Sequence, residues 1–317
     1  MRDTAYTDFR DAFFEELFRI AKKDPDVILL MADQGALSFE KFKKEIPKQI
    51  INAGTAEQNM IGVAAGLAMT GKKVFVHAIA NFTTLRCYEQ IKVDLSIMNL
   101  PVTIVGVGAG FAYTSDGPTH HANQDIAAMR AIPNMKIFNA SDTYSLAKFA
   151  YLAYKSDCPV YIRFDKGNFP IIHDKTEDNL KDGFSFLRHG KDTLVVSTGV
   201  MVHKVLEISE ILKREKLNIG VMDIYRLKPI NEPLLLRAIK KYKNIITVEE
   251  HIEIGGLGSI IGELLAKMSV TLEFKKICLA DSNIFVYGDR DYMLSKVNLD
   301  NKSLSNKIAQ LINKSNY

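Results

Sequence analysis

A loop with an acid and two histidines is the strongest chemical signal in the sequence. It reads Ser-Asp-Gly-Pro-Thr-His-His, from Ser115 to His121, and follows the apolar, β-branched run Val102–Val107. Asp-Gly-Pro is a turn signal, which accounts for the glycine and the proline but not for the acid and the histidines. Histidine is suited to proton transfer near neutral pH, and Asp116 is placed to orient the imidazole of His120. Adjacent histidines rarely converge on one ion, so no metal site is expected.

Two further candidates lie upstream, a glutamate and a phenylalanine. Thr55 and Gln58 have the spacing of a capping box, so a helix is expected to begin there, with Glu57 in a first turn where the helix dipole favours a carboxylate. On the local pattern alone, this helix start is the better explanation of Glu57. Phe82 follows the apolar run Val74–Ile79, and loops after parallel strands are where α/β sheets bind ligands. Its ring either fills the core or offers a flat face to an aromatic ligand.

Alternating strand and helix patterns position these loops. Short apolar, β-branched runs predict strands, and amphipathic segments between them predict helices. Near-continuous apolar strands between helices indicate parallel sheets covered on both faces, so the predicted fold class is α/β with two doubly wound domains. A polar, turn-prone stretch within 169–191 predicts a boundary between a first domain at 1–180 and a smaller second domain at 181–317.

The predicted strands are Val27–Met31, Val74–Ile79, Val102–Val107, 137–138, Val160–Phe164, Leu194–Ser197, Ile219–Asp223, Ile245–Glu249 and Val270–Leu279. The predicted helices are Phe9–Lys22, Ala56–Met69, Val202–Lys213, Leu234–Lys241 and one after Gly258.

Composition excludes several classes of protein. The 41 basic and 37 acidic residues give a net charge of only +4, which does not favour nucleic-acid binding. No apolar run approaches the ~20 residues that span a bilayer, and the polar N-terminus lacks the apolar segment of a signal peptide. The three cysteines lie far apart and indicate a reducing compartment. A cytoplasmic enzyme or enzyme subunit is therefore expected.

Three blocks of the sequence together resemble the pyrimidine-binding domain of transketolases. They are GTAEQNMIGVAAGLAMTGKKVF, ANFTTLRCYEQIK and SDGPTHHANQDIAAMRAIPNMKIFNASD. The wider resemblance runs from about residue 4 to about residue 255 and includes the later segments VEEH and GGLG. DGPTH followed by DIAAMRAIPNM is the specific element, because both the motif and its offset to the IPN turn match.

The resemblance implies thiamine diphosphate and Mg²⁺ as cofactors and a role for each candidate residue. Glu57 matches the glutamate that bonds N1′ of the aminopyrimidine and stabilises the imino tautomer, whose 4′ nitrogen takes the proton from thiazolium C2. Phe82 matches the aromatic residue that stacks on this ring. Asp116 and His120 match residues that contact sugar hydroxyls near the cleaved bond, with His120 counted as catalytic beside Glu57. Arg163, in VYIRFDKGN, matches an arginine that binds the substrate's phosphate.

Two departures from the family pattern concern the substrate. Full-length transketolases carry a phosphate-binding histidine eight residues before the aspartate of DGPTH, where this chain has Gly108, and a phosphate-binding serine falls near Leu37. Arg163 alone is a poor match for a phosphate dianion, which several charge-assisted bonds normally share. We therefore expect a ketose other than the usual pentose phosphates, with Gly108 leaving room for a bulkier group.

The largest departure is a missing motif. Transketolases hold Mg²⁺ and the diphosphate with Gly-Asp-Gly and a later asparagine, and the nearest string here is Gly288-Asp289-Arg290. In split transketolases that half lies on a separate large subunit. The resemblance thus implies a small subunit that transfers a two-carbon ketol unit between sugars only together with a large subunit carrying the diphosphate-binding domain. The small-residue helix at Gly62–Ala68 predicts close association, as in a dimer of heterodimers.

Three other interpretations remain at this point. The beta subunit of a 2-oxo-acid dehydrogenase first component shares the roles of Glu57 and Phe82, and deoxyxylulose-phosphate synthase is normally one full-length chain. The DGPTH motif favours transketolase, as does the lack of an extended loop between residues 88 and 101. A non-catalytic scaffold subunit is the third, against which the presence of Glu57, Asp116 and His120 together argues.

Overall fold

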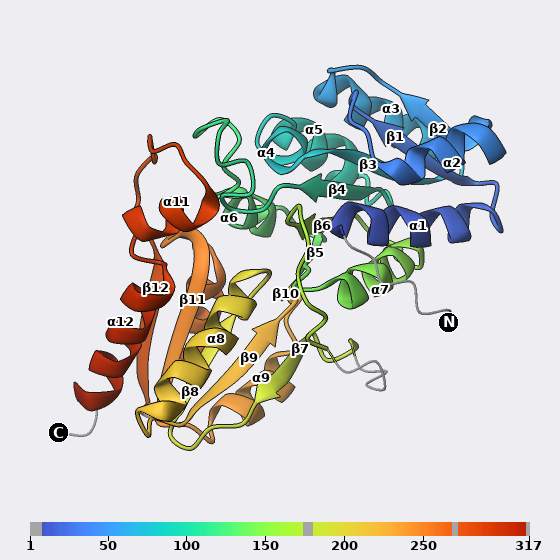
Figure 1. Cartoon of the computed structure of the whole chain (residues 1–317). Helices are drawn as coiled ribbons and strands as arrows, with labels where there is room; N and C mark the ends of the chain where they lie inside the picture. Colours follow the sequence, from blue (N-terminus) through green and yellow to red (C-terminus); the bar gives the residue numbers. More distant parts are fainter. Residues whose placement is uncertain (1–7, 174–179, 268–271, 315–317) are drawn as a thin grey trace.

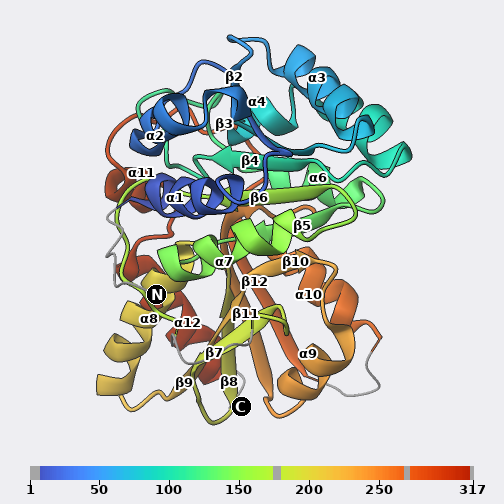
Figure 2. The ribbon, with the colours of Figure 1, turned by 90° about the vertical axis from the view of Figure 1, so that its right-hand side faces the viewer.

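The chain folds into two α/β units, each built on its own sheet with helices beside it (Figures 1 and 2). The computed structural model describes residues 8–173, 180–267 and 272–314. The first sheet has seven strands in the order β10-β5-β6-β4-β3-β1-β2, and the second has five in the order β12-β11-β8-β9-β7. The predicted α/β fold with two sheets is confirmed.

The first sheet contains β1 (Val27–Met31), β2 (Ile50–Asn52), β3 (Lys73–Ile79), β4 (Thr103–Val107), β5 (Lys136–Asn139), β6 (Val160–Phe164) and β10 (Arg226–Lys228). Its helices are α1 (Phe9–Ala21), α2 (Leu37–Glu45), η1 (Pro47–Gln49), α3 (Glu57–Met69), α4 (Ala80–Thr84), α5 (Tyr88–Gln90), the π-helix η2 (Ile91–Ile97), α6 (Asp125–Ala131) and α7 (Thr143–Tyr154).

The second sheet contains β7 (Phe184–Arg188), β8 (Thr193–Ser197), β9 (Ile219–Ile224), β11 (Asn244–Ile252) and β12 (Glu273–Leu279). Its helices are α8 (Met201–Arg214), α9 (Glu232–Ile239), α10 (Leu257–Leu265), α11 (Arg290–Lys296) and α12 (Asn301–Lys314). Figure 2 shows α8 and α12 on one side of this sheet and α9 and α10 on the other.

Apolar side chains cover both faces of the first sheet. Along β1, Ile28 and Leu30 join one hydrophobic cluster while Val27 and Leu29 join another, as the two-residue period of a strand requires. Helix α3 packs on the first of these clusters, and the phenylalanine-rich α1 packs on the second together with α2 and α7. The strands are therefore buried on both sides, which explains their continuous apolar sequences.

Several features differ from the sequence-based expectations. The edge strands β7 and β10 run antiparallel to their neighbours. The residues of β10 come from the second half of the sequence, but the strand pairs with β5 in the first sheet. β10 has only three residues and β7 is only partly buried, so neither carries the continuous apolar run that marks the buried strands. Part of the predicted domain boundary (174–179) and the start of the predicted strand at Val270 lie outside the described residues.

The predicted capping box at Thr55 is wrong, although the helix begins where expected. Gly54 has a φ of 70°, a left-handed conformation that glycine favours, and the turn it makes places Ala56 at the N-cap of α3. No side chain caps the helix there. Glu57 is consequently the first residue of α3, directed by the turn rather than by a capping bond.

The sheet register brings the candidate loops together. Strands β3 and β4 are parallel neighbours in which Ile79 pairs with Val107, so the segments that follow them start side by side. β3 also pairs with β1, whose other neighbour β2 leads into α3. The start of α3, the helix α4 after β3 and the loop after β4 therefore meet at the carboxyl edge of the sheet, where α/β folds bind ligands.

Candidate active site

A buried carboxylate lies at the start of α3. The side chain of Glu57 is 3% exposed, and its Oε2 accepts a hydrogen bond from Arg86 Nη1 at 2.7 Å. Burying a carboxylate is costly unless a cation or hydrogen bonds compensate it. Arg86 provides that compensation, and because its own side chain is 42% exposed, the ion pair reaches from the interior to the surface.

Phe82 on α4 lies next to this ion pair. The guanidinium carbon of Arg86 is 4.1 Å from the centroid of the Phe82 ring, in cation–π contact. Arg86 therefore joins Glu57 to Phe82, although the sequence gives no direct link between these two residues. Arg86 was not among the residues predicted from the sequence, because it lies in the turn after α4 and its partner Glu57 is 29 residues away.

His120 completes the cluster from the loop after β4. Its ring meets Phe82 edge-on at a centroid distance of 4.9 Å. Asn81 on α4 fixes the loop, since its Nδ2 donates to the carbonyl oxygens of Thr119 at 3.1 Å and His121 at 2.9 Å. The hydroxyl of Thr119 lies 2.9 Å from His120 Nδ1. Thr119 thus occupies the orienting position that the sequence analysis gave to Asp116.

The other two polar residues of this loop have different surroundings. Asp116 is exposed to solvent. His121 is buried against Phe111, with ring centroids 5.1 Å apart, and burial lowers the pKa of His121, with the charge of His120 adding to the effect. Of the two histidines, only His120 contacts Phe82 and is partly open to solvent.

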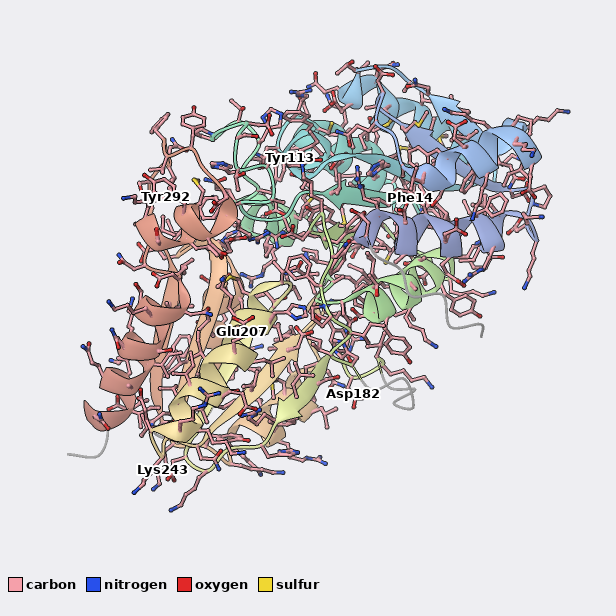
Figure 3. The ribbon with its side chains drawn as sticks, viewed as in Figure 1. Phe14, Tyr113, Asp182, Glu207, Lys243 and Tyr292 are labelled. Atoms are coloured by element: carbon pink, nitrogen blue, oxygen red, sulfur yellow. The ribbon has the colours of Figure 1, made fainter. Side chains whose placement is uncertain are left out.

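Tyr113 fills the space above Gly108. Gly108 has a φ of 93°, and a Cβ built on it would clash with the ring of Tyr113. The expectation that Gly108 leaves room for a bulky substrate group is therefore wrong. The Tyr113 ring lies 5.9 Å from that of His120, and Lys166 Nζ lies 4.4 Å from its centroid. Figure 3 shows Tyr113 on the loop near α4, at the same upper side of the molecule as Tyr292 on α11.

Arg163 lies outside this cluster. Its side chain is 6% exposed, and its Nε donates to Asp125 Oδ2 at 2.7 Å. The remaining guanidinium nitrogens donate to Ala122 O at 2.8 Å and to Asn139 Oδ1 at 3.3 Å. Every nitrogen is engaged within the protein, which differs from the expected contact with a substrate phosphate. Arg163 instead supports the end of the loop that carries His120.

The donor set at the cluster fits one part of the implied cofactor. A buried carboxylate beside a partly exposed aromatic ring suits a flat ligand with an N–H at its edge, as an aminopyrimidine provides. Among residues 8–173, 180–267 and 272–314, no group of three or more His, Cys, Asp or Glu side chains is arranged to hold a metal ion.

No described helix is both long and apolar enough to cross a membrane.

This fold and site define the class of the protein. The family model for the transketolase pyrimidine-binding domain matches residues 5–171, and the model for the transketolase C-terminal domain matches residues 184–303. The first match covers all three elements of the cluster. The chain belongs to the transketolase family.

Relatives of nearly the same length show which members of this family the chain resembles. The chain is 32% identical over 307 residues to one of the subunits of the apulose-4-phosphate transketolase of Phocaeicola vulgatus, covering 96% of this chain and 97% of the relative. It is 31% identical to a 6-deoxy-6-sulfo-D-fructose transketolase subunit of a Clostridium species, covering 97% and 95%.

A solved structure shares the same arrangement. A split-gene transketolase, solved as an inactive β4 tetramer, superposes with a TM-score of 0.84 at 31% identity, covering 96% of this chain and 97% of that one. These three matches are to transketolase subunits or split transketolase chains of nearly the same length, so the beta subunit of a 2-oxo-acid dehydrogenase is not favoured. The family and the small-subunit architecture predicted from the sequence are confirmed.

Proposed function

We propose that this chain is the small subunit of a thiamine-diphosphate-dependent transketolase and contributes the aminopyrimidine half of the active site. The observation that carries this proposal is the convergence of Glu57, Phe82 and His120 at one sheet edge, with Arg86 contacting the first two. When bound, thiamine diphosphate supplies the electron sink for cleaving a bond next to a carbonyl group. The protein's task is to hold the ring, the proton and the sugar.

Each residue of the cluster has one task in this proposal. Glu57 holds a proton at its carboxylate toward N1′ of the aminopyrimidine, and the low exposure of its side chain keeps water from competing for that hydrogen bond. Phe82 offers its ring face for stacking. His120, oriented by the Thr119 hydroxyl, exchanges a proton with a sugar hydroxyl, and exposed Asp116 accepts a hydrogen bond from another hydroxyl.

The sugar's anionic group is proposed to meet Lys166 rather than Arg163. Lys166 Nζ lies over Tyr113, beside His120, whereas Arg163 has its nitrogens committed to Asp125 and backbone or amide oxygens. The two relatives named above act on different anionic sugars by their names, so a terminal anion is proposed without a choice between phosphate and other groups. Tyr113 limits the size of what enters above Gly108.

A large subunit is proposed to hold Mg²⁺ and the diphosphate, because the chain has no Gly-Asp-Gly motif. The contact surface is proposed on the first domain. Gly62 and Gly66 on α3 have open space where a Cβ would lie, and exposed apolar side chains, Val63 and Met69, flank them. Helix η2, which packs beside α3, adds exposed Ile97. Apolar patches of this kind mark association surfaces, and a dimer of heterodimers is proposed.

The test is reconstitution. The chain and its large subunit are purified separately and mixed, and two-carbon transfer between ketose and aldose substrates is measured with thiamine diphosphate and Mg²⁺. We expect transfer by the mixture, no transfer by either chain alone, and micromolar cofactor binding only by the complex. Turnover of 2-oxo acids instead, or a complex that assembles but transfers nothing, would reject the proposed function.

A cytoplasmic location is also proposed, because the three cysteines of the chain are free, as in a reducing compartment.

A further inference from the structure

The guanidinium group of Arg86 contacts both the Glu57 carboxylate and the Phe82 ring. These are the two contacts that the proposed function assigns to the aminopyrimidine ring of the cofactor. Its Nη1 lies 2.7 Å from Glu57 Oε2, and its guanidinium carbon lies 4.1 Å from the centroid of Phe82. A guanidinium is planar, carries N–H donors along its edge and stacks on aromatic faces. A 4-aminopyrimidine that carries a proton on its ring nitrogen has the same features: a flat delocalised cation with an N–H that faces a carboxylate.

We propose that Arg86 is an internal stand-in for the aminopyrimidine, held in the ring's place until the cofactor displaces it. This inference rests on the proposed function. The carboxylate of Glu57 is almost fully buried, so an empty site would leave a charge without a partner, which is unfavourable. Arg86 compensates this charge and covers the Phe82 face while the cofactor is absent.

The side chain of Arg86 is suited to leave. It is 42% exposed, and its unbranched stem reaches the site from the surface, so rotation of the stem moves the guanidinium into water without opening the core. The contrast with Arg163 is informative, because that guanidinium is 6% exposed and bound on every nitrogen. Arg86, by contrast, combines contact with Glu57 and access to solvent.

Displacement has a measurable consequence for affinity. Only the fraction of molecules with Arg86 displaced can accept the ring, and the apparent dissociation constant rises by the inverse of that fraction. A partly exposed ion pair and a partly exposed cation–π contact are each modest, so together they are expected to weaken cofactor binding by about tenfold.

The experiment compares variants of the complex reconstituted with the large subunit. Thiamine diphosphate is titrated calorimetrically into the wild type, Arg86→Leu and Arg86→Lys, with thermal melts as a check of folding. Arg86→Leu is expected to bind about tenfold more tightly, and Arg86→Lys to fall between it and the wild type. Arg19→Leu is the matched control, since Arg19 is 48% exposed and pairs with Glu16 at 3.0 Å on α1; its affinity should equal that of the wild type.

Crystal structures of the complex with and without cofactor provide a second measurement, independent of whether Arg86→Leu assembles. The guanidinium is expected over Phe82 without cofactor and away from Glu57 with it. Equal or weaker binding by Arg86→Leu, or a guanidinium that keeps both contacts with the ring bound, would overturn the inference and make Arg86 a permanent support of Glu57. A wild-type complex that does not bind the cofactor would instead reject the proposed function.

Discussion

Two arginines of the first domain use the same ion-pair chemistry in opposite ways. Arg86 pairs with Glu57 at 2.7 Å and is 42% exposed, whereas Arg163 pairs with Asp125 at the same distance and is 6% exposed. The guanidinium of Arg86 also lies over the ring of Phe82, whereas Asp125 accepts hydrogen bonds from Arg163 and from the hydroxyl of Tyr161. The first pair is open to exchange with a ligand; the second is a closed part of the core.

The difference in exposure distinguishes an ion pair at a ligand site from an ion pair that holds the fold. A buried polar network with every donor committed holds loops in place, and a ligand can bind it only by breaking those bonds. A carboxylate whose cationic partner extends into solvent can exchange that partner for a ligand. Substitutions at one member of each ion pair, with activity and stability measured separately, distinguish the two regions.

The largest effect is expected for Glu57→Gln in the reconstituted enzyme. Glutamine has nearly the same shape but cannot hold the proton required at N1′, and loss of acid–base assistance typically costs ~10²–10⁴-fold in rate. Glu16→Gln, at a partly exposed carboxylate of α1, is the matched control and should retain full activity. Steady-state rates at saturating cofactor decide the question, and a loss below tenfold for Glu57→Gln would remove Glu57 from the catalytic role.

The second effect concerns stability. Arg163→Met leaves the fully buried carboxylate of Asp125 without its cation, and breaking a buried pair in this way typically costs ~3–5 kcal/mol. Arg86→Met also leaves a buried carboxylate, but water can reach Glu57 through the space that the partly exposed guanidinium vacates, so a smaller loss of ~1–3 kcal/mol is expected. Urea titrations of the isolated chains measure both values. Equal losses in the two variants would show that exposure does not separate the two regions.

The third effect is a pH dependence from a buried group between the two domains. His173 Nδ1 lies 2.9 Å from Asp142, at the start of α7, and its Nε2 lies 3.4 Å from Asp223 on β9. Burial lowers the pKa of His173, but the hydrogen bond to Asp142 and the ion pair with Asp223 outweigh it and raise the pKa to about 10. Because the pKa in the folded state exceeds the ordinary value of about 6.5, the protonated imidazole stabilises the fold fully below pH ~6.5, and this stabilisation is lost as the pH rises through about 10.

We therefore expect the free energy of unfolding to fall by roughly 3 kcal/mol between pH 7 and pH 10. His173→Gln has no such charge to lose, so its unfolding free energy should be lower at pH 7 and nearly flat over the same interval. Chemical denaturation at a series of pH values provides the measurement. A wild-type curve parallel to that of His173→Gln would show that His173 is not the titrating group.

The sequence predicted much of this molecule, and its failures have physical causes. Strands such as Val160–Phe164 are buried on both faces, so their apolar runs are unambiguous, and the glycine turn before Glu57 fixes the start of α3. The roles of Arg163 and Gly108 depended on which neighbours fill the surrounding space, here Asp125 and Tyr113. Such long-range contacts leave no local pattern. Arg86 was missed for the same reason, since its partner Glu57 is 29 residues away.

The smallest effect is expected for Phe82→Ala. The ring is partly buried and contacts Arg86 on its face and His120 at its edge, so its removal takes away stacking without opening a large cavity. Aromatic pairs typically contribute ~0.5–1.5 kcal/mol beyond the area they bury, which corresponds to a roughly two- to thirteen-fold rise in the cofactor concentration needed for half-maximal activity. Rates at saturating cofactor should change far less than in Glu57→Gln, because the carboxylate that holds the proton remains. Phe82→Tyr keeps a stacking face and should restore the wild-type cofactor requirement. If Phe82→Ala instead lowers the saturated rate as strongly as Glu57→Gln does, Phe82 positions the reacting groups and is more than a stacking surface.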